Sequence, residues 1–399
     1  MITVAVVGAG AAGLVAAAFS AASGAKTILV ERTKDGGRKV LISGGGRCNV
    51  LPSVLAPERF VTDSPTHLLR AMLRAWPLHE QRAFFEHDLN IPLALEEESG
   101  KLFPRSNRAK DVRDGLVEFA RSKGVEIRFD TVVNDVTRSD SGFAIETSRG
   151  IVNCDRVILA TGGLSVPATG SDGIGLNIAR RFGHDMIDTY PALTPLLAKD
   201  DLHSSLSGVS LNVRLRARVG SNTTESSGGF LFTHRGYSGP SVLDVSHLTE
   251  RGNQPVIRAQ WSTMRAADWE SQLEAHSASI LAILSKFIPG RLAEQLMREA
   301  NIPGDRRTSS LKRSERLALI DALTSYPLPW SGNEGYKKAE VTGGGVKLTE
   351  VDAKTMQSRK VPGLYLCGEM LDAFGPIGGH NFSWAWATGR AAGLAAAHA

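Results

Sequence analysis

The pattern of hydrophobic and polar positions begins with a strand, a helix and a second strand. An unbroken apolar run over residues 4–7 predicts a short buried strand. The alanine-rich segment that follows predicts a helix ending near Ser23, and the apolar residues 27–30 predict a second strand that ends at Glu31. Strand, helix and strand in this order are typical of a βαβ unit with a parallel sheet.

The first half of the chain continues with helices and strands. Helical spacing of apolar residues predicts helices within residues 57–90 and over 111–123, where Gly124 ends the second one. Another helix is predicted to open at Gly170. Compact or alternating apolar runs predict five strands between these helices, at residues 126–129, 132–136, 143–147, 151–154 and 156–160.

The pattern changes after Pro191. Alternation over residues 211–219 predicts a strand that carries Arg214, Arg216 and Arg218 on one face. Helical spacing returns later, and two further strands and a helix over about 382–397 close the chain. We therefore predict an α/β fold in which a first domain is interrupted by an insertion. Its parts are the first domain (1–190 with 335–399), a β-rich insert (191–264 with 325–334) and a helical subdomain (265–324).

Glycines at the end of the first strand add chemistry to this pattern. Gly8, Gly10 and Gly13 form G-x-G-x-x-G between the first strand and helix, and Glu31 follows the second strand. This arrangement is typical of dinucleotide binding: the glycines permit a tight turn, a close approach to a pyrophosphate and close helix–strand packing. The helix N-terminus offers free N–H groups to the phosphates. Glu31 is expected to bind a ribose hydroxyl.

A second glycine-rich, cationic loop favours FAD over NAD as the bound dinucleotide. Gly36-Gly37-Arg38-Lys39 precedes the stretch 43–49, which reads SGGGRCN. Consecutive glycines expose backbone N–H groups, which suits a loop laid along a phosphate, a ribityl chain or a flavin ring. A flexible hinge is the simpler alternative. No second G-x-G-x-x-G follows a strand, so NAD(P)H, if it is the reductant, would have to use the same active-site face.

Two later glycine-rich stretches also indicate binding of a nucleotide or a flavin. Residues 160–163 read ATGG after a predicted strand, the second place where the chain meets the nucleotide in two-dinucleotide-binding flavoproteins. Gly378-Gly379-His380-Asn381 precedes the last predicted helix, whose N-terminus suits the electron-rich pyrimidine edge of a reduced flavin.

Composition limits the class of protein. The chain has 399 residues, enough for two or three domains, with 42% hydrophobic and 22% charged residues, as in a soluble globular protein. A net charge of +5 permits an anionic partner without requiring one. Three widely spaced cysteines suggest neither a disulfide framework nor a metal site. With no signal-peptide pattern and no apolar run of about 20 residues, we expect a cytoplasmic protein without a membrane span.

Four stretches together resemble the HI0933-like flavoproteins, also labelled NAD(P)/FAD-dependent or aminoacetone-oxidase-like oxidoreductases. They are the fingerprint with Glu31, the glycine loop that ends at Asn49, the ATGG stretch and the stretch before the last helix. The resemblance covers almost the whole chain and is strongest at residues 38–49 and 340–381. It implies a Rossmann-type FAD domain interrupted by a β-barrel-like insert that carries a small helical subdomain. Together with the motifs above, it predicts these FAD-binding residues: Gly8, Gly10, Gly13, Glu31, Arg32, Arg38, Lys39, Ser43, Gly44, Gly45, Val133 (through its backbone, to the adenine), Thr161, Gly162, Gly368, Glu369, Gly378, Gly379 and Asn381.

The resemblance leaves the substrate open. Members have been associated with reduction of conjugated double bonds in steroid-like acids, with oxidation of small amines, and with reduction of uridine to dihydrouridine in large-subunit ribosomal RNA. Members often carry G-G-Y-N where this chain has Gly-Gly-His380-Asn381, so a titratable ring is expected near the flavin. Three functions are weighed: an NAD(P)H-driven reductase of an activated C=C bond, which we favour, an amine oxidase, and a non-catalytic flavin- or RNA-binding protein. The sequence leaves the oligomeric state open.

Reduction of a C=C bond needs a proton donor as well as a hydride. Cys48 is our candidate, with His380 as its rival, although Arg38, Lys39 and Arg47 are expected to lower the pKa of the Cys48 thiol, which would oppose that role. A small packed residue is the structural alternative for Cys48.

A basic run in the helical subdomain is the candidate contact with an RNA substrate. It comprises Arg306, Arg307, Lys312, Arg313 and Arg316. A solvated helix face is the default explanation of such a run, but arginine also suits phosphate contacts. Together with the resemblance, this favours ribosomal RNA as the acceptor.

Overall fold

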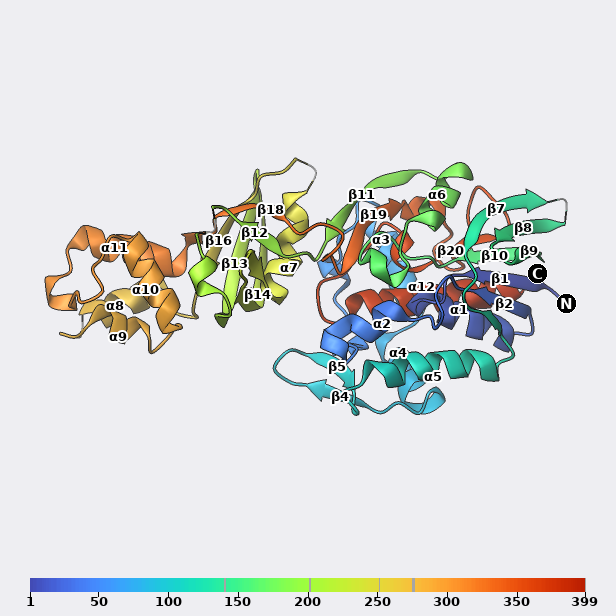
Figure 1. Ribbon diagram of the computed structural model, residues 1–399, viewed down its shortest axis with the longest axis horizontal. Helices are drawn as coiled ribbons and strands as arrows, with labels where there is room; N and C mark the ends of the chain where they lie inside the picture. The colour runs from blue at the N-terminus through green and yellow to red at the C-terminus, as the bar shows by residue number, and fades with distance from the viewer. Residues whose placement is uncertain (140, 201, 251, 275–276, 399) are drawn as a thin grey trace. The chain divides into compact units, whose positions relative to one another are not determined.

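The computed structural model describes residues 1–139, 141–200, 202–250, 252–274 and 277–398 (Figure 1). The chain forms two compact units, Met1–Pro191 with Glu340–Ala399 and Ala192–Ala339. Each unit has a hydrophobic core of its own. The β-rich and the helical segments that the sequence separates lie together in the second unit.

A five-stranded parallel sheet forms the centre of the first unit. Its strand order is β20-β10-β1-β2-β6. The bounds are β1 (Thr3–Val7), β2 (Lys26–Val30), β6 (Glu126–Arg128), β10 (Arg156–Leu159) and β20 (Leu364–Leu366). The predicted Rossmann-type arrangement is confirmed, since β1 pairs in parallel with β2 on one side and with β10 on the other. Such a reversal of strand order opens a crevice at the carboxyl ends of the strands, where ligands bind in this class of sheet.

Two helices cross closely beside this sheet, α1 (Ala11–Ala22) and α12 (His380–Ala397). A Cβ atom added to Gly389 would lie 2.4 Å from the carbonyl oxygen of Ala12, and one added to Gly393 would lie 2.3 Å from that of Ala16. Glycine is therefore required at both positions, and the helices approach backbone to backbone. The predicted start of the last helix, at about residue 382, is two residues late.

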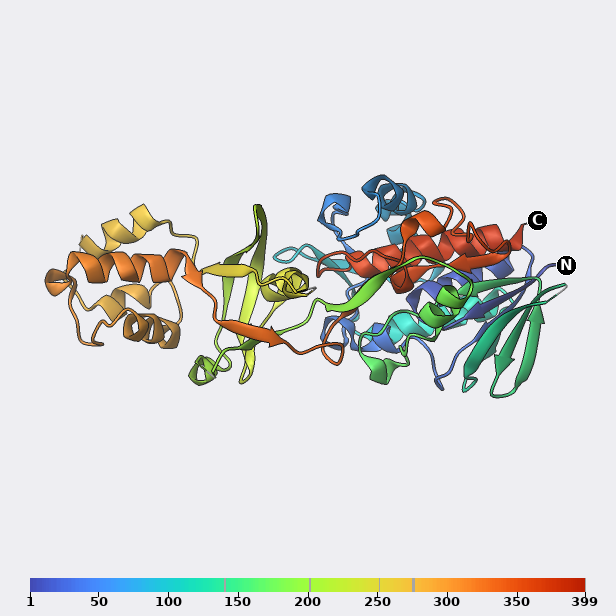
Figure 2. The ribbon, with the colours of Figure 1, turned by 90° about the horizontal axis from the view of Figure 1, so that it is seen from above.

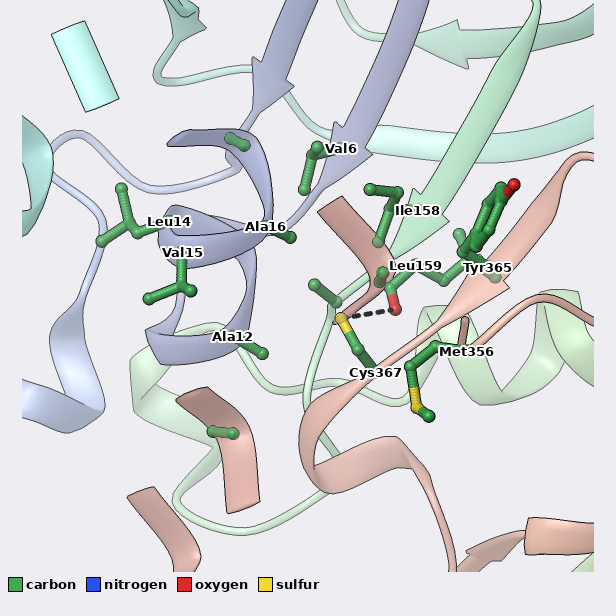
Figure 3. Close-up of a cluster of buried hydrophobic side chains, with 14 of the residues drawn as sticks. Val6, Ala12, Leu14, Val15, Ala16, Ile158, Leu159, Met356, Tyr365 and Cys367 are labelled. Atoms are coloured by element: carbon green, nitrogen blue, oxygen red, sulfur yellow. Dashed lines mark hydrogen bonds between the residues drawn. The ribbon is translucent and has the colours of Figure 1, made fainter. Parts of the chain in front are cut away.

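The core between sheet and helix is apolar and continuous (Figure 3). Leu14 and Val15 of α1 are fully buried, as are Ile158 and Leu159 of β10. The Cys367 thiol points at the carbonyl oxygen of Leu159, 3.8 Å away. This cysteine is thus a packed core residue.

The remaining elements of the first unit surround this centre. The helices are α2 (Arg38–Ile42), α3 (Thr66–Arg74), α4 (Leu78–Ala83), α5 (Ala109–Ser122) and α6 (Ile174–Arg181). Smaller sheets have the orders β3-β5-β4, β7-β8-β9 and β11-β19. Their strands are β3 (Leu51–Pro52), β4 (Leu93–Glu96), β5 (Lys101–Pro104), β7 (Val133–Ser139), β8 (Gly142–Thr147), β9 (Gly150–Cys154), β11 (Met186–Ala192) and β19 (Val341–Val346). The helical stretch predicted within 57–90 is divided at Pro77, which precedes α4.

A curved antiparallel sheet forms the second unit's β-rich part. Its order is β17-β16-β13-β14-β15-β12-β18. The bounds are β12 (Leu196–Ala198), β13 (Ser210–Val219), β14 (Asn222–Phe232), β15 (Gly236–Ser238), β16 (Val256–Gln260), β17 (Tyr326–Pro327) and β18 (Trp330–Asn333). The two end strands, β17 and β18, are joined by Leu328 and Pro329 alone, so the edges of the sheet must lie near each other. The sheet is curled, in keeping with the expected barrel-like form.

Among the described residues of the helical part there are four helices, α8 (Ala266–Glu274), α9 (Ile280–Leu284), α10 (Gly290–Glu299) and α11 (Arg313–Thr324), drawn in orange tones in Figure 2. A further helix, α7 (Pro240–Ser246), packs on β14. The Trp261 indole donates to the Ala322 carbonyl at 3.0 Å and ties the end of β16 to α11. In the described part of the chain, every helix is too short or too polar to cross a membrane.

Candidate functional site

The fingerprint turn lies where β1 and β10 end side by side. Gly8 has φ +101°, and a Cβ there would lie 2.6 Å from the Ala160 carbonyl oxygen. A Cβ at Gly13 would lie 1.8 Å from the Gly8 carbonyl oxygen, so strand and helix touch through their backbones. At Gly10, by contrast, an added Cβ meets no atom within 4 Å. Gly8 and Gly13 close the turn, and Gly10 leaves open space at the N-terminus of α1, where a pyrophosphate would need it.

Glu31 is held against this turn by its own hydrogen bonds. Its carboxylate accepts from the Ala9 backbone N–H at 2.7 Å and from the Thr33 N–H at 2.8 Å. The Thr33 hydroxyl donates to the same carboxylate at 2.7 Å. The side chain is 9% exposed. These bonds leave part of the acceptor capacity of two carboxylate oxygens for a ribose hydroxyl.

The second glycine loop has a backbone that only glycines adopt without strain. Gly44, Gly45 and Gly46 follow one another with φ values of 56°, 68° and 85°. A Cβ at Gly45 or Gly46 would meet no atom within 4 Å. The loop thus presents an uncovered backbone, as a cofactor-binding loop must.

A polar network links this loop region to three distant segments. The Lys39 ammonium donates to the Glu369 carboxylate at 2.7 Å and to the Ser165 hydroxyl at 2.5 Å. The same carboxylate accepts from the Ser165 hydroxyl at 2.7 Å and from the Thr342 N–H at 3.1 Å. Lys39 and Glu369 were both predicted to bind cofactor, and the structure brings them together. Ser165 and Thr342 were missed, because their role depends on contacts between segments far apart in the sequence.

Most other cations of the first unit's predicted site are already paired. Arg32 pairs with Asp172, and Arg38 pairs with Asp35 at 3.1 Å. Arg47 pairs with Glu96 at 3.0 Å and its guanidinium lies 4.0 Å from the Phe103 ring centroid. The positive charge that the sequence places around the loop is therefore largely compensated.

This pairing corrects the expectation for Cys48. The thiol is fully buried, and burial raises its pKa to about 12, with only a hydrogen bond to Ser43 acting in the opposite direction. Arg38, Lys39 and Arg47 do not lower it as expected, because desolvation dominates and each cation has an acidic partner. Cys48 is thus a protonated thiol at neutral pH.

The N-terminus of α12 holds a buried imidazole without a partner. His380 is 4% exposed, and neither ring nitrogen has a hydrogen bond within the described residues. Burial, with a smaller contribution from the Arg59 charge, lowers its pKa to about 4. The Phe60 ring lies edge-on at 6.0 Å between centroids. His380 is neutral at pH 7, with one donor and one acceptor unused.

Residues 48–52 run along the beginning of α12 and bring the two predicted catalytic segments together. A Cβ at Gly379 would lie 2.5 Å from the Leu51 carbonyl carbon, and the Trp386 indole donates to the Val50 carbonyl at 3.2 Å. Two more buried polar atoms, Asn49 Oδ1 and Ser383 Oγ, have no hydrogen-bond partner among the residues that the structure describes. Unpartnered buried polar groups cost free energy. They fit the pyrimidine edge of a flavin, which offers both donors and acceptors.

The other predicted cofactor residues lie at the carboxyl edge of the sheet or in supporting positions. Thr161 lies against Gly175, where an added Cβ would be 2.1 Å from its hydroxyl, and Gly162 has φ +72°. Gly368 follows β20, Gly378 precedes α12, and Val133 begins β7. Asn381 is different: its amide donates to and accepts from the backbone of Gly375, at 2.9 and 2.8 Å, and so holds the loop before α12. Ser43 likewise donates to the Val40 carbonyl at 2.9 Å.

The basic run in the second unit is only partly free. Arg306 pairs with Glu315 at 3.4 Å, and Arg316 pairs with Glu270 and Glu274 at 3.0 and 3.2 Å. The remaining three cations are exposed and have no ion pair in the part of the chain that the structure describes: Arg307, Lys312 and Arg313. The five charges therefore do not act as one patch, because acids on α8 and α11 neutralise two of them.

Comparisons with known proteins show the family to which the chain belongs. The chain matches the HI0933-like protein Rossmann domain over residues 2–395. It is 34% identical over 388 residues to the ribosomal RNA dihydrouridine synthase of Escherichia coli, covering 96% of this chain and 95% of that protein. It is 32% identical over 405 residues to the 3-dehydro-bile acid delta(4,6)-reductase of Clostridium scindens, covering 98% of both.

A solved structure shows the same fold at low identity. The 3-ketosteroid delta1-dehydrogenase from Sterolibacterium denitrificans superposes with a TM-score of 0.55 at 12% identity, and the match covers 100% of each chain. These similarities, together with the glycine turn, the open loop and the unpartnered polar groups at α12, establish the family of the chain and its class of enzyme. It belongs to the HI0933-like family and is an FAD-dependent oxidoreductase.

Proposed function

We propose that this protein reduces a carbon–carbon double bond conjugated to a carbonyl group, with NAD(P)H as the source of electrons. The observation that carries the proposal is the group of unpartnered polar atoms on Asn49, His380 and Ser383, beside a buried protonated thiol on Cys48. Two relatives have names that denote this type of reduction, a dihydrouridine synthase and a delta(4,6)-reductase.

The residues divide into those that would hold FAD and those that would handle a proton. Gly10 and the N-terminus of α1 would receive the pyrophosphate, and Glu31 the ribose. Lys39, fixed by Glu369 and Ser165, would offer its positive charge to the ribityl–phosphate part. FAD, when bound, supplies hydride transfer between NAD(P)H and the acceptor. Neutral His380 would bind and orient the flavin ring rather than protonate the acceptor.

Cys48 is our candidate for the proton donor, and its thiol carries a proton at neutral pH. One carbon of the double bond takes the hydride and the other takes a proton, so the donor must carry a proton at neutral pH. A thiol with a pKa of about 12 carries one, and the neutral imidazole of His380 also keeps one N–H proton, so the assignment rests on the place of Cys48 after the glycine loop and not on its acidity. The resulting thiolate would recover its proton through the hydroxyl of Ser43, its half-buried hydrogen-bond partner, because the thiol itself does not reach solvent. NAD(P)H provides both electrons, so the reaction balances without a further reductant.

Uridine in ribosomal RNA is our preferred acceptor. The uracil C5–C6 double bond is conjugated to the C4 carbonyl. The relative from Escherichia coli is named for the product of this reduction, and it matches this chain over nearly its whole length. The exposed cations Arg307, Lys312 and Arg313 are candidates for phosphate contacts. An acceptor in ribosomal RNA implies a cytoplasmic enzyme.

The test compares dihydrouridine in ribosomal RNA from cells with the gene, without it, and with a Gly10→Val version. Dihydrouridine should be present only with the intact gene. Equal content in all three strains would contradict the proposal.

A small enone is the second candidate acceptor. It is favoured by the 32% identity to a bile acid reductase over 98% of both chains. Anaerobic reoxidation of the NAD(P)H-reduced protein by a steroid-like enone, at a rate unaffected by salt or RNA, would support this candidate over ribosomal RNA.

A further inference from the structure

One face of the second unit's sheet is an exposed row of arginines. Along β13 the side chains alternate: Val213, Leu215 and Ala217 are buried, while Arg214, Arg216 and Arg218 are exposed. Residues two apart on a strand lie about 7 Å from each other. This interval is comparable to the spacing of successive phosphates along a nucleic acid strand.

Neighbouring strands extend this face with more basic and polar groups. Arg258 of β16 lies opposite Arg216 in the antiparallel register, and Ser227 of β14 lies opposite Arg214. Thr223 of β14 lies opposite Arg218. We call the surface formed by Arg214, Arg216, Arg218 and Arg258 the arginine face. Its hydroxyl neighbours can donate to phosphate oxygens as well.

The charge of the arginine face is poorly compensated. Glu225 pairs with Arg216 at 2.6 Å, but both side chains are exposed and the pair is worth little in water. Arg218 and Arg258 use one donor each on the carbonyl oxygens of Gly220 and Ser325. Arg214 has no ion pair within the described residues. Each guanidinium therefore keeps donors free for an anion.

We propose that the arginine face binds the sugar–phosphate backbone of the RNA acceptor. This inference rests on the proposed reduction of uridine and names the surface that recognises the RNA. Charge complementarity and the regular spacing favour a phosphate backbone over a protein partner, whose interfaces bury apolar centres. The face supplies sequence-independent affinity, because phosphate contacts position a nucleic acid without reading its bases.

The experiment compares two triple variants that each remove three positive charges. Arg214→Thr, Arg216→Thr and Arg218→Thr alter the arginine face with a residue that strands accept. The control of equal charge changes Arg307→Ser, Lys312→Ser and Arg313→Ser, the rival candidates for phosphate contacts in the helical part. The probe is a fluorescein-labelled hairpin of large-subunit ribosomal RNA, titrated by anisotropy over a series of KCl concentrations. FAD content and NAD(P)H oxidation serve as folding controls and should be unchanged in both.

The arginine-face variant should bind more weakly and depend less on salt. Each lost phosphate contact lowers the slope of log Kd against log salt by about 0.7 to 0.9, so three lost contacts lower it by about 2 to 3. The control should retain a steeper slope than the arginine-face variant. A second variant with Arg214→Lys, Arg216→Lys and Arg218→Lys should keep the slope of the original protein, because the charge is kept, but not its full affinity. This variant also covers the case in which the threonine variant does not fold.

The outcomes separate this inference from the proposed function. An unchanged slope in the arginine-face variant, or a loss confined to the control variant, overturns the arginine face while dihydrouridine formation still stands. Salt-independent binding by the unaltered protein also overturns it. Absence of any gene-dependent dihydrouridine removes the proposed function, and with it this inference.

Discussion

At the scale of single residues, the site stands out because it leaves polar atoms unsatisfied. His380, Asn49 and Ser383 are all buried, and at least one polar atom on each has no hydrogen bond among the described residues. A folded protein normally avoids this, since each such atom costs about 1–3 kcal/mol. A bound ligand that supplies the missing partners recovers the loss, so part of the affinity for FAD would come from these atoms.

Replacing Gly10 should remove FAD without unfolding the protein. The Cβ of a valine there meets no protein atom within 4 Å, so the fold tolerates it, but its methyl groups occupy the space of the pyrophosphate. We expect colourless Gly10→Val protein with a normal circular dichroism spectrum. Gly304→Val is the matched control, because its Cβ also meets open space, and it should stay yellow. Stoichiometric flavin in Gly10→Val would refute the assignment of the turn.

Acid should destabilise the protein through His380. Its pKa is about 4 in the folded state and about 6.5 when unfolded, so between these values only the unfolded chain takes up the proton. Stability contributed by the neutral ring is thus complete above pH 6.5 and is lost as the pH falls towards 4. The His380→Tyr variant, which carries the residue common among HI0933-like flavoproteins, lacks this pH-dependent contribution to the unfolding free energy. Between pH 7 and pH 5 the unfolding free energy of the original protein should fall by about 2 kcal/mol more than that of the variant.

Urea unfolding at both pH values provides this measurement. Parallel changes in the two proteins would mean that His380 is not held neutral by its environment.

Cys48→Ala should separate the two half-reactions. Reduction of the flavin by NAD(P)H needs no acid from the protein, so its rate should be unchanged. Reoxidation by the organic acceptor should slow by about 10²- to 10⁴-fold, the usual contribution of a positioned acid. Stopped-flow absorbance of the flavin follows both steps. Unaltered reoxidation would leave Cys48 as a packed core residue, and Cys154→Ala, also a buried thiol, is the control for packing.

At the scale of elements, the sequence predicted the features that depend on local patterns better than the features that depend on long-range contacts. The strands β1, β2 and β10 and the helix α1 follow from apolar runs and glycine positions, which are local properties. The crossing of α1 and α12 does not, because Gly389 and Gly393 are separated by most of the chain from the alanines that they touch. The same reason explains why Ser165 and Thr342 were not predicted, and why the Cys48 pKa was predicted in the wrong direction.

The close helix crossing should make Gly393→Ala destabilising. A methyl group 2.3 Å from the Ala16 carbonyl oxygen forces the two backbones apart. Overpacking of this kind costs about 1–3 kcal/mol. The upper part of this range outweighs the gain of about 1 kcal/mol in helix propensity when glycine is replaced by alanine. We expect a lower Tm by thermal unfolding. Gly304→Ala, which meets no neighbour, should leave the Tm nearly unchanged, and an equal or higher Tm for Gly393→Ala would show that the helices can separate freely.

At the scale of the whole molecule, the second unit is an insertion whose two ends are held together by the first. The chain leaves through β11 and returns through β19, and these strands pair with each other. Gly344 lies against the backbone of Asp188, and Gly343 lies against the ring of Tyr190. Pro191 and Glu340, the points where the chain passes between units, must therefore lie close together. The two separate cores give each unit its own source of stability.

Excision of the insertion should therefore leave a folded flavoprotein that no longer binds RNA. The variant joins Pro191 to Glu340 through a short glycine–serine linker, which the β11–β19 pair allows without moving either strand. All predicted FAD contacts lie outside residues 192–339, so flavin absorbance should persist, whereas the cations proposed to bind RNA are removed. Anisotropy with the ribosomal RNA hairpin should show at least a tenfold weaker affinity than the full chain. If the excised protein folds but loses its flavin, the insertion contributes to cofactor binding; if it keeps full RNA affinity, the RNA-binding surface lies on the first unit.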